Sequence, residues 1–268
     1  MKIHLLGTGA ADGIPGLFQA NRVSEVARTE GGKDRRTRSA AVINDTLKID
    51  FGPDTLSQAL TQGLHPTDWT GILFTHSHDD HLSRKELQYA LYPFTENHFA
   101  PFTIYCNSVV AAKLHHTYDA WPFEIIEIGL GDTLVHDGIE ITPIEAFHKL
   151  DEVCFNYILN DGSATFLYGT DTGVWREDTW NVLRGFQLDG LLIECTNGKM
   201  PSPYFGHLNC EEVLAVVDRL HTEGILKPDA PITTTHHSAM GDMTHKELEA
   251  FFAPHGIDPG FDGMILEI

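Results

Sequence analysis

A cluster of metal-binding residue types directly after an apolar run is the feature that most limits how this chain can fold. Residues 72–74 are apolar, and a His-x-His-x-Asp-His sequence follows them closely. His76 and His78 are two residues apart at the end of a predicted strand, so both imidazoles can point to one side and bind one ion. Asp80 and His81 open the next turn and can reach a second ion. Imidazole together with carboxylate suits zinc, manganese or iron.

Three further candidate ligands stand at the ends of other apolar runs. His148, Asp171 and His236 each come shortly after a predicted strand. Polar groups on the loops that follow strands are often part of a binding site. Each of them alone would more often have a structural role, but two neighbouring ions need more ligands than the first cluster provides. We therefore predict that all three help to bind two divalent metal ions.

Short apolar runs alternate with turn signals along most of the chain, which predicts many strands with helices between them. The predicted strands cover residues 3–6, 41–43, 46–49, 72–75, 103–105, 125–128, 139–144, 155–159, 165–168, 190–194, 231–234 and 263–268. Capping-box sequences before apolar residues at helical spacing predict helices that begin after Asn209 and Thr244. Weaker helical patterns cover residues 54–62, 83–91, 109–118 and 177–184. No repeat or linker interrupts this pattern, so we expect a mixed α/β protein with a single domain over residues 1–268.

The charge of the chain limits its partners. Eighteen Lys and Arg residues against 38 Asp and Glu residues give a net charge of −20. Such a field repels polyanions, which argues against a large nucleic-acid footprint but not against a small phosphorylated substrate at a metal site. No run approaches the roughly 20 apolar residues of a membrane span, and the first residues lack a signal-peptide pattern. We therefore expect a cytoplasmic protein with no membrane partner.

One segment, residues 17–38, is rich in basic residues, unlike the acidic chain as a whole, and its sequence predicts a long loop. Its six basic residues are Arg22, Arg28, Lys33, Arg35, Arg36 and Arg38. Long loops in compact domains are often functional or disordered. Two interpretations therefore stay open, namely a solvated and mobile loop, or a lid that offers cations to a phosphate.

The ligand-type residues and the Gly-rich segments near both ends resemble the metallo-β-lactamase superfamily. The resemblance runs over nearly the whole chain, from Thr8-Gly9 to the Gly-Phe-Asp-Gly-Met sequence at 260–264. It implies an α/β fold of the αββα sandwich type, in which two packed mixed β-sheets carry helices on their outer faces. It also implies a dinuclear metal site at one edge of the sandwich.

The resemblance implies a ligand set for each ion. The first ion would take His76, His78, His148 and Asp171, and the second would take Asp80, His81, Asp171 and His236. Asp171 would then bridge the two ions. His237 is an alternative to His236, and the order Thr-His-x-Ser at 235–238 favours His236.

Three features are similar to the phosphodiesterase branch of the superfamily, which includes ribonuclease Z and PhnP-like cyclic-phosphate phosphodiesterases. They are the Gly-rich opening up to Pro15, the Gly206-His207 pair before a predicted helix, and the Gly-Phe-Asp-Gly-Met ending. This similarity implies a small or cyclic phosphodiester substrate that is attacked by a metal-bridging hydroxide. His207 would be the general acid toward the leaving oxygen, and Asp80, mainly a ligand, would also orient the hydroxide.

The resemblance leaves alternatives open. PhnP-like proteins carry cysteines for a structural zinc in the early loop, and residues 16–38 contain none. The same ligand set would serve a lactam, lactone or thioester hydrolase, and a non-catalytic PqqB-like binding or carrier protein would share the fold. His207 and the Gly-rich opening favour the phosphodiesterase. The sequence is compatible with a homodimer but does not require one.

Overall fold

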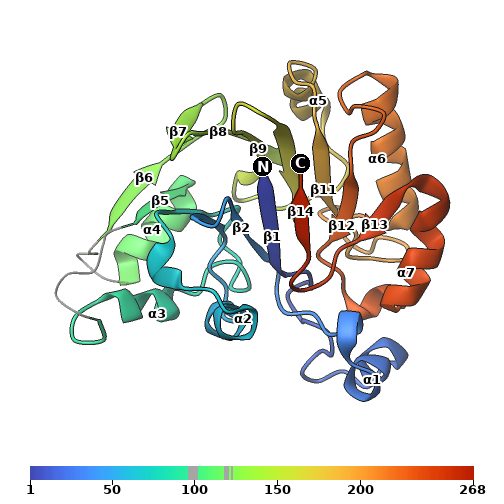
Figure 1. Cartoon of the computed structure of the whole chain (residues 1–268), viewed down its shortest axis with the longest axis horizontal. Helices are drawn as coiled ribbons and strands as arrows, with labels where there is room; N and C mark the ends of the chain where they lie inside the picture. Colours follow the sequence, from blue (N-terminus) through green and yellow to red (C-terminus); the bar gives the residue numbers. More distant parts are fainter. Residues whose placement is uncertain (96–101, 118–120, 122) are drawn as a thin grey trace.

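Two β-sheets packed face to face form the centre of the computed structural model, which describes residues 1–95, 102–117, 121 and 123–268 (Figure 1). Each sheet has seven strands. The first sheet has the order β14 (Ile265–Glu267), β1 (Lys2–Gly7), β2 (Ala40–Ile43), β3 (Leu47–Ile49), β4 (Gly71–Leu73), β5 (Thr103–Cys106), β6 (Glu124–Glu127). The second sheet has the order β13 (Ile257–Pro259), β12 (Ile232–Thr235), β11 (Gly190–Glu194), β10 (Thr165–Gly169), β9 (Cys154–Asn160), β8 (Ile139–Ala146), β7 (Leu134–His136).

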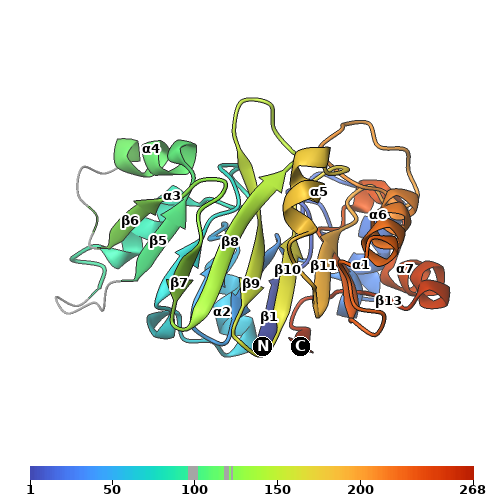
Figure 2. The same ribbon diagram turned by 90° about the horizontal axis from the view of Figure 1, so that it is seen from above.

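Helices cover the outer face of each sheet, which confirms the predicted αββα sandwich (Figure 2). The helices over the first sheet are α2 (Thr55–Gln62), α3 (Arg84–Leu87) and α4 (Ser108–Thr117). Those over the second sheet are α5 (Glu177–Leu183), α6 (Cys210–Thr222) and α7 (His245–Phe252). Helix α1 (Arg22–Thr29) packs against two short 3-10 helices, η1 (Gly32–Asp34) and η4 (Ala239–Gly241). The other 3-10 helices of the described residues are η2 (Pro66–Asp68), η3 (Gln88–Ala90) and η5 (Ala253–His255). None of the helices in the described ranges has the length and apolar character needed to cross a bilayer.

Alternate residues of facing strands fill the space between the two sheets. Phe155, Tyr157 and Leu159 on β9 are buried there with Ile3 and Leu5 on β1. Successive side chains of a strand point to opposite faces, so this period of two sends the intervening residues to the outer faces. The sandwich therefore follows from the apolar alternation of its strands.

Helices α6 and α7 begin at the capping boxes that the sequence predicted. The side chains of Asn209 and Thr244 accept hydrogen bonds from the backbone N–H groups of Glu212 and Glu247, and the carboxylates of both glutamates accept one from the backbone N–H of the cap residue. These bonds satisfy backbone N–H groups that the first helical turn leaves without partners. The apolar α6 residues at helical spacing then face the second sheet, and they are Val213, Val216, Val217 and Leu220.

Each predicted strand run contains a strand of the structure, but β7 and β13 have no counterpart among them. Both are edge strands of three residues. β13 ends in Pro259, which cannot donate a ladder hydrogen bond, and such short edge strands carry a weak sequence pattern. The predicted helix over 109–118 corresponds to α4, with residue 118 outside the described residues.

The prediction of a loop over residues 17–38 is wrong at 22–29, where α1 begins at an Asn21 cap. The lid interpretation also does not fit the observed contacts, because the cations of the segment already have partners. Arg35 donates to the backbone carbonyls of Ala27 and Arg28, and Arg28 pairs with Glu25. Arg22 contacts Asp242 and Glu247, Lys33 contacts Glu249, and Arg38 contacts Asp54. These pairs connect the segment to α2, to α7 and to the turn before α7.

Arg36 holds the same segment from inside the protein. Its buried guanidinium donates hydrogen bonds to the Thr8 hydroxyl at 2.7 Å, to Gly260 O at 2.5 Å and to His245 Nδ1 at 2.9 Å. Burial and the Arg36 charge lower the pKa of His245 to about 4, so its imidazole stays neutral and can accept this bond. Arg36 thus connects three distant parts of the chain.

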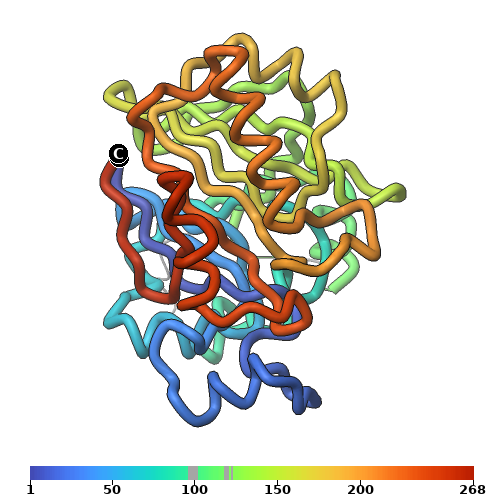
Figure 3. Tube along the Cα trace, turned by 90° about the vertical axis from the view of Figure 1, so that its right-hand side faces the viewer, coloured from blue at the N-terminus to red at the C-terminus, as the bar shows by residue number. Residues whose placement is uncertain are grey.

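The two ends of the chain lie side by side in the first sheet (Figure 3). β1 pairs with β14 in antiparallel register, with Ile3 opposite Leu266. Close to this pair, Asp262 accepts hydrogen bonds from the backbone N–H and the hydroxyl of both Thr8 and Thr37 at 2.7–2.9 Å. The C-terminal region therefore fixes the loop that follows β1.

We expect Arg36→Met to lower the free energy of unfolding by roughly 2–3 kcal/mol, because it leaves buried acceptors without donors. Arg22→Met removes the same charge from an exposed ion pair and should cost less than about 1 kcal/mol. Urea unfolding of both variants measures the difference. Equal destabilisation by the two substitutions would contradict the role assigned to Arg36.

Candidate metal centre

The predicted ligands come together at one edge of the sandwich, where strand ends from both sheets meet. β10, β11 and β12 are parallel, and β8 runs in the same direction because one antiparallel strand, β9, separates it from β10. His148, Asp171 and His236 follow β8, β10 and β12 at this edge. The loop after β4 brings the residues from His76 to His81 to the same place from the first sheet. Ligands of α/β proteins commonly bind outside such carboxyl ends.

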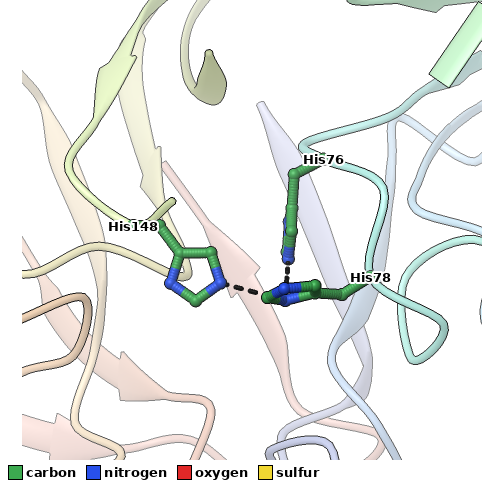
Figure 4. A group of neighbouring side chains, drawn as sticks. All are labelled: His76, His78 and His148. Carbon is green, nitrogen blue, oxygen red and sulfur yellow. Dashed lines mark hydrogen bonds between the residues drawn. The ribbon is translucent and has the colours of Figure 1, made fainter. Parts of the chain in front are cut away.

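Three imidazoles form the first group of the site (Figure 4). His76 Nε2 lies 2.9 Å and His148 Nε2 lies 3.1 Å from the same atom, His78 Nδ1. Burial lowers the pKa of all three side chains, so their neutral forms are favoured. Neutral imidazole is the form that binds metal ions.

Asp171 connects this group to a second group made by Asp80, His81 and His236. Asp171 Oδ2 lies 2.6 Å from His81 Nε2, and Asp171 Oδ1 lies 3.0 Å from His236 Nε2. Asp80 Oδ2 lies 3.1 Å from His81 Nε2 and 3.8 Å from His236 Nε2. Burial opposes the charge on Asp171, but the His236 and His81 imidazoles hold the pKa of this carboxyl well below its usual range.

The buried carboxylate of Asp50 fixes the protons of two of these imidazoles. It accepts hydrogen bonds from His81 Nδ1 at 2.6 Å and from the Thr75 hydroxyl at 2.9 and 3.0 Å. Burial opposes protonation of His81, but the Asp171 and Asp80 carboxylates raise its pKa well above the usual value. An ion that took the place of the Nε2 proton would leave the remaining proton on Nδ1, bonded to Asp50, and the lone pair on Nε2. The Thr75 hydroxyl gives its proton to Asp50, so it accepts one from His76 Nδ1, 3.0 Å away. His76 Nε2 is then also left with a lone pair that faces the site.

Glu194, at the end of β11, has the corresponding role in the second sheet. Its donors are Thr172 N, Thr196 N, the Thr196 hydroxyl, Leu208 N and His207 Nδ1. Because the Thr196 hydroxyl donates to Glu194 at 2.6 Å, it accepts a hydrogen bond from His236 Nδ1 at 2.8 Å. The oxygens of Glu194 are thus already engaged, and we assign it a supporting role and not that of a ligand.

The atoms that face the centre of the site fit a cation. His81 Nε2, His236 Nε2 and both carboxylate oxygens of Asp171 are buried and have no hydrogen-bond partner among the described residues. His148 Nδ1 donates to Gly206 O at 3.0 Å, so its Nε2 also points inward with a lone pair. One unsatisfied buried polar atom costs about 1–3 kcal/mol, and a group of them needs an explanation such as an ion. Imidazole nitrogens and carboxylate oxygens suit divalent zinc, manganese or iron.

The structure brings His236, and not His237, into this cluster. His237 Nε2 lies 3.3 Å from the Thr234 hydroxyl, and its backbone N–H and C=O bond to Thr8 and Ala10. Burial, together with the nearby charge of Arg36, holds the pKa of His237 well below its usual value. His237 therefore supports the loop after β1 through these backbone hydrogen bonds and does not contribute to the cluster.

The backbone of the site is held in a conformation that most residues avoid. Asp50, Asp171 and His236 have φ values of 57°, 51° and 55°. This left-handed region is uncommon for residues other than glycine, and it costs roughly 1–3 kcal/mol for each residue. In each case the turn directs a polar side chain into the site right after a strand ends.

A cavity of about 240 Å³ opens beside the cluster. Its walls are formed by Ala10, Ala11, Asp12, His78, Asp80, Asp171, Thr196, His207, His236 and Ser238. His207 Nδ1 donates to Glu194 at 2.7 Å, and its ring stacks on that of His236 at 5.4 Å. Burial opposes protonation, but the Glu194 carboxylate raises the pKa of His207 to about 9. His207 therefore carries a proton on Nε2 as well, the nitrogen that Glu194 does not occupy.

Sequence reasoning did not identify Asp50, Glu194 or Asp12 as parts of the site. Asp50 directly follows the predicted strand at 46–49, and Glu194 ends the predicted strand at 190–194. A carboxylate at the end of an apolar strand was the signal that identified Asp171, and it could have found both. Asp12 lies in a loop without a periodic sequence pattern, so no sequence signal identified it. Its position beside the cavity follows only from the structure.

Comparison with protein families agrees with this geometry. The model described as "Beta-lactamase superfamily domain" matches residues 46–226, well over half of the chain. The chain belongs to this family. The superfamily is one of metallo-hydrolases, which confirms the predicted resemblance and makes a metal-dependent hydrolase the general expectation for this fold. The search of curated proteins found no match.

Three solved structures show the same fold over the whole of this chain. A diphosphatase from the PhnP family has 22% identity and a TM-score of 0.76, with 97% of that chain covered. Zinc-bound PqqB from Methylobacterium extorquens has 16% identity and a TM-score of 0.78, with 100% of that chain covered. The short form of human tRNase Z has 17% identity and a TM-score of 0.64, with 99% covered. At these identities the likeness concerns the fold, so the reaction has to be argued from the site.

We expect Asp50→Asn to weaken zinc binding by roughly 10- to 100-fold, because the acceptor that orients His81 is replaced by an amide. Competition with a chromophoric zinc chelator measures the affinity. Asp258→Asn, an exposed change of the same charge on β13, should leave the affinity unchanged. Unaltered zinc affinity in the Asp50 variant would show that the carboxylate does not orient the site.

Proposed function

We propose that this chain is a metal-dependent phosphodiesterase that hydrolyses small or cyclic phosphodiesters. The observation that carries the proposal is His207, an imidazole on the wall of a small cavity that is hydrogen-bonded through Nδ1 to the Glu194 carboxylate and lies next to a cluster of bare imidazole and carboxylate atoms. A leaving alkoxide needs a proton, and a positioned acid that supplies it contributes typically 10²–10⁴-fold to a rate. The cavity volume of about 240 Å³ suits a small substrate.

The ligand assignment follows the two groups of inward-facing atoms. We assign the first ion to His76, His78, His148 and Asp171, and the second to Asp80, His81, Asp171 and His236. Asp171 would be a ligand of both ions, because its oxygens face His81 and His236 of the second group and it also forms a group of converging donor atoms with His76 of the first. Two divalent ions bound there supply Lewis-acid polarisation of a phosphoryl oxygen and lower the pKa of a bound water.

The residues of this chain provide the remaining parts of the reaction. Asp50 and Glu194, directly or through Thr75 and Thr196, keep the imidazoles of His76, His81 and His236 in one orientation, so this part of the site needs little rearrangement when substrate binds. His207 holds its Nε2 proton toward the cavity and donates it to the oxygen that leaves phosphorus. Glu194 accepts from Nδ1 of the same ring and stabilises its protonated form.

A metal-removal experiment tests the proposal. The protein loaded with zinc or manganese is expected to hydrolyse bis(p-nitrophenyl) phosphate, and chelation with EDTA should abolish turnover until metal is added back. Metal content is measured on the same samples. Two bound ions without turnover of this diester, together with turnover of a lactone or thioester, would instead favour the carbon-centred hydrolases. Two bound ions without any turnover would favour a binding role.

The role of His207 has a separate test. We expect His207→Ala to keep its metal content and to lose roughly 10²–10⁴-fold in rate on diesters with alkyl leaving groups. The loss should be much smaller with p-nitrophenolate, which leaves without a proton. His221→Ala, an exposed change in the last turn of α6, is the control. An equal loss across the series of leaving groups would show that His207 positions the substrate and is not the acid.

A further inference from the structure

Asp12 presents a carboxylate to the cavity that the proposed reaction does not use. It lies in the loop after β1 and forms part of the same wall as His207 and His236. In the part of the chain that the structure describes, it belongs to none of the groups whose donor atoms converge within 4.8 Å. Asp12 is therefore placed to contact a substrate and not an ion.

One oxygen of Asp12 is engaged by the protein and the other is open. Oδ2 accepts hydrogen bonds from Gln19 Nε2 at 2.6 Å and from the Ser238 hydroxyl at 3.0 Å. The Ser238 oxygen itself accepts from Met240 N, so its proton is directed to Asp12. Oδ1 has no hydrogen-bond donor among the described residues. Asp12 is half-buried and lines the cavity, so this free oxygen is the acceptor that the side chain can offer to a bound molecule.

The loop that carries Asp12 is fixed on both sides. Ala10 N bonds to His237 O, and Ile14 N bonds to Arg36 O, both at 2.9 Å. The Arg28 guanidinium donates to the carbonyls of Gly16 and Gln19, which holds the partner of Asp12 in place. A fixed acceptor loses little freedom when a ligand binds, so it discriminates well between ligands.

The charges of the cavity decide which group fits this acceptor. Asp12 faces a cavity whose described walls also contain Asp80 and Asp171 but neither Lys nor Arg. An additional anionic group of a substrate beside Asp12 would be repelled by its carboxylate, since the His207 imidazolium on this wall is already paired with Glu194, whereas an O–H or N–H group would donate to Oδ1.

We propose that Asp12 is a specificity-determining residue that accepts a hydrogen bond from a hydroxyl or amino group of the substrate. It would thereby select phosphodiesters of polyols or amino alcohols over diesters that lack such a donor. This inference rests on the proposed function, because it assumes that the cavity holds a phosphodiester.

A pair of substrates that differ in one hydroxyl tests the inference. Glycerol 1,2-cyclic phosphate has a free hydroxyl beside the ring, and propane-1,2-diol cyclic phosphate lacks it. The metal-loaded protein is expected to hydrolyse the first with a kcat/KM roughly 10- to 100-fold higher, as for a hydrogen bond to a charged group. Calorimetry with glycerol 1-phosphate and propane-1,2-diol 1-phosphate gives the same comparison as a binding ratio, without turnover.

Asp12→Asn is the matching variant. Its amide oxygen is needed by the donors of Gln19 and Ser238, so the amide NH₂ would face the cavity and could not accept from a hydroxyl. The preference for the glycerol substrate is expected to fall to within about twofold of unity. Glu30→Gln removes the same charge from an exposed position at the end of α1 and should keep the wild-type preference.

The outcomes separate this inference from the proposed function. Equal kcat/KM values for the two substrates in the wild-type protein, or an unchanged preference in Asp12→Asn, would overturn the role of Asp12 alone. The wild-type comparison needs no variant, so a folding defect in Asp12→Asn cannot conceal the answer. If the metal-loaded wild type hydrolysed none of the three diesters, that is, neither cyclic phosphate nor bis(p-nitrophenyl) phosphate, the proposed function would be overturned. The role of Asp12 would be overturned with it.

Discussion

The site depends on hydrogen bonds from imidazole and hydroxyl groups to two buried carboxylates, Asp50 and Glu194. Each stands at the carboxyl end of a strand, one in each sheet, and each accepts only. The ring N–H groups of the surrounding histidines therefore point away from the centre of the site, bonded to a carboxylate directly or through the hydroxyl of Thr75 or Thr196. The lone pairs of the imidazoles are left pointing inward, where they converge with Asp171. Without the two carboxylates, the same histidines could exchange tautomers and the inward-facing set would no longer be defined.

This arrangement is held by the packing of the rest of the protein. Three polar residues with left-handed backbone and several unpaired buried atoms destabilise the site edge. The apolar alternation of the two sheets and the helices on their outer faces provide the compensating stability. Around the cavity, the loop after β1 is fixed by Arg36 and Asp262, which lie in distant parts of the sequence. The site is therefore a product of the whole sandwich and not of one local motif.

Much of this could be predicted from the sequence because strand ends and residue types are local properties. His76, His148 and Asp171 were identifiable by their places after apolar runs, and Asn209 marked the start of α6 by a local pattern. The roles of Asp50 and Glu194 could not be predicted, since they depend on which hydroxyl and imidazole groups the two sheets bring together. Helix α1 was missed partly because Arg22, in its first turn, is paired with acids more than 200 positions away, Asp242 and Glu247. Short edge strands such as β13 carry too few residues for a pattern.

The closeness of β1 to β14, and of Thr8 to Asp262, has a consequence for the order of assembly during translation. The loop that carries Asp12 receives its anchors from residues near position 262, which the ribosome adds long after the histidines at 76–81. A nascent chain that already contains the first ligands therefore still lacks the entrance to the cavity. The β14 edge of the first sheet and the Asp262 anchor of this loop are completed together, after the metal-ligand candidates from His76 to His236 have been added. Synthesis thus delivers this anchor later than the ligands that it stands beside.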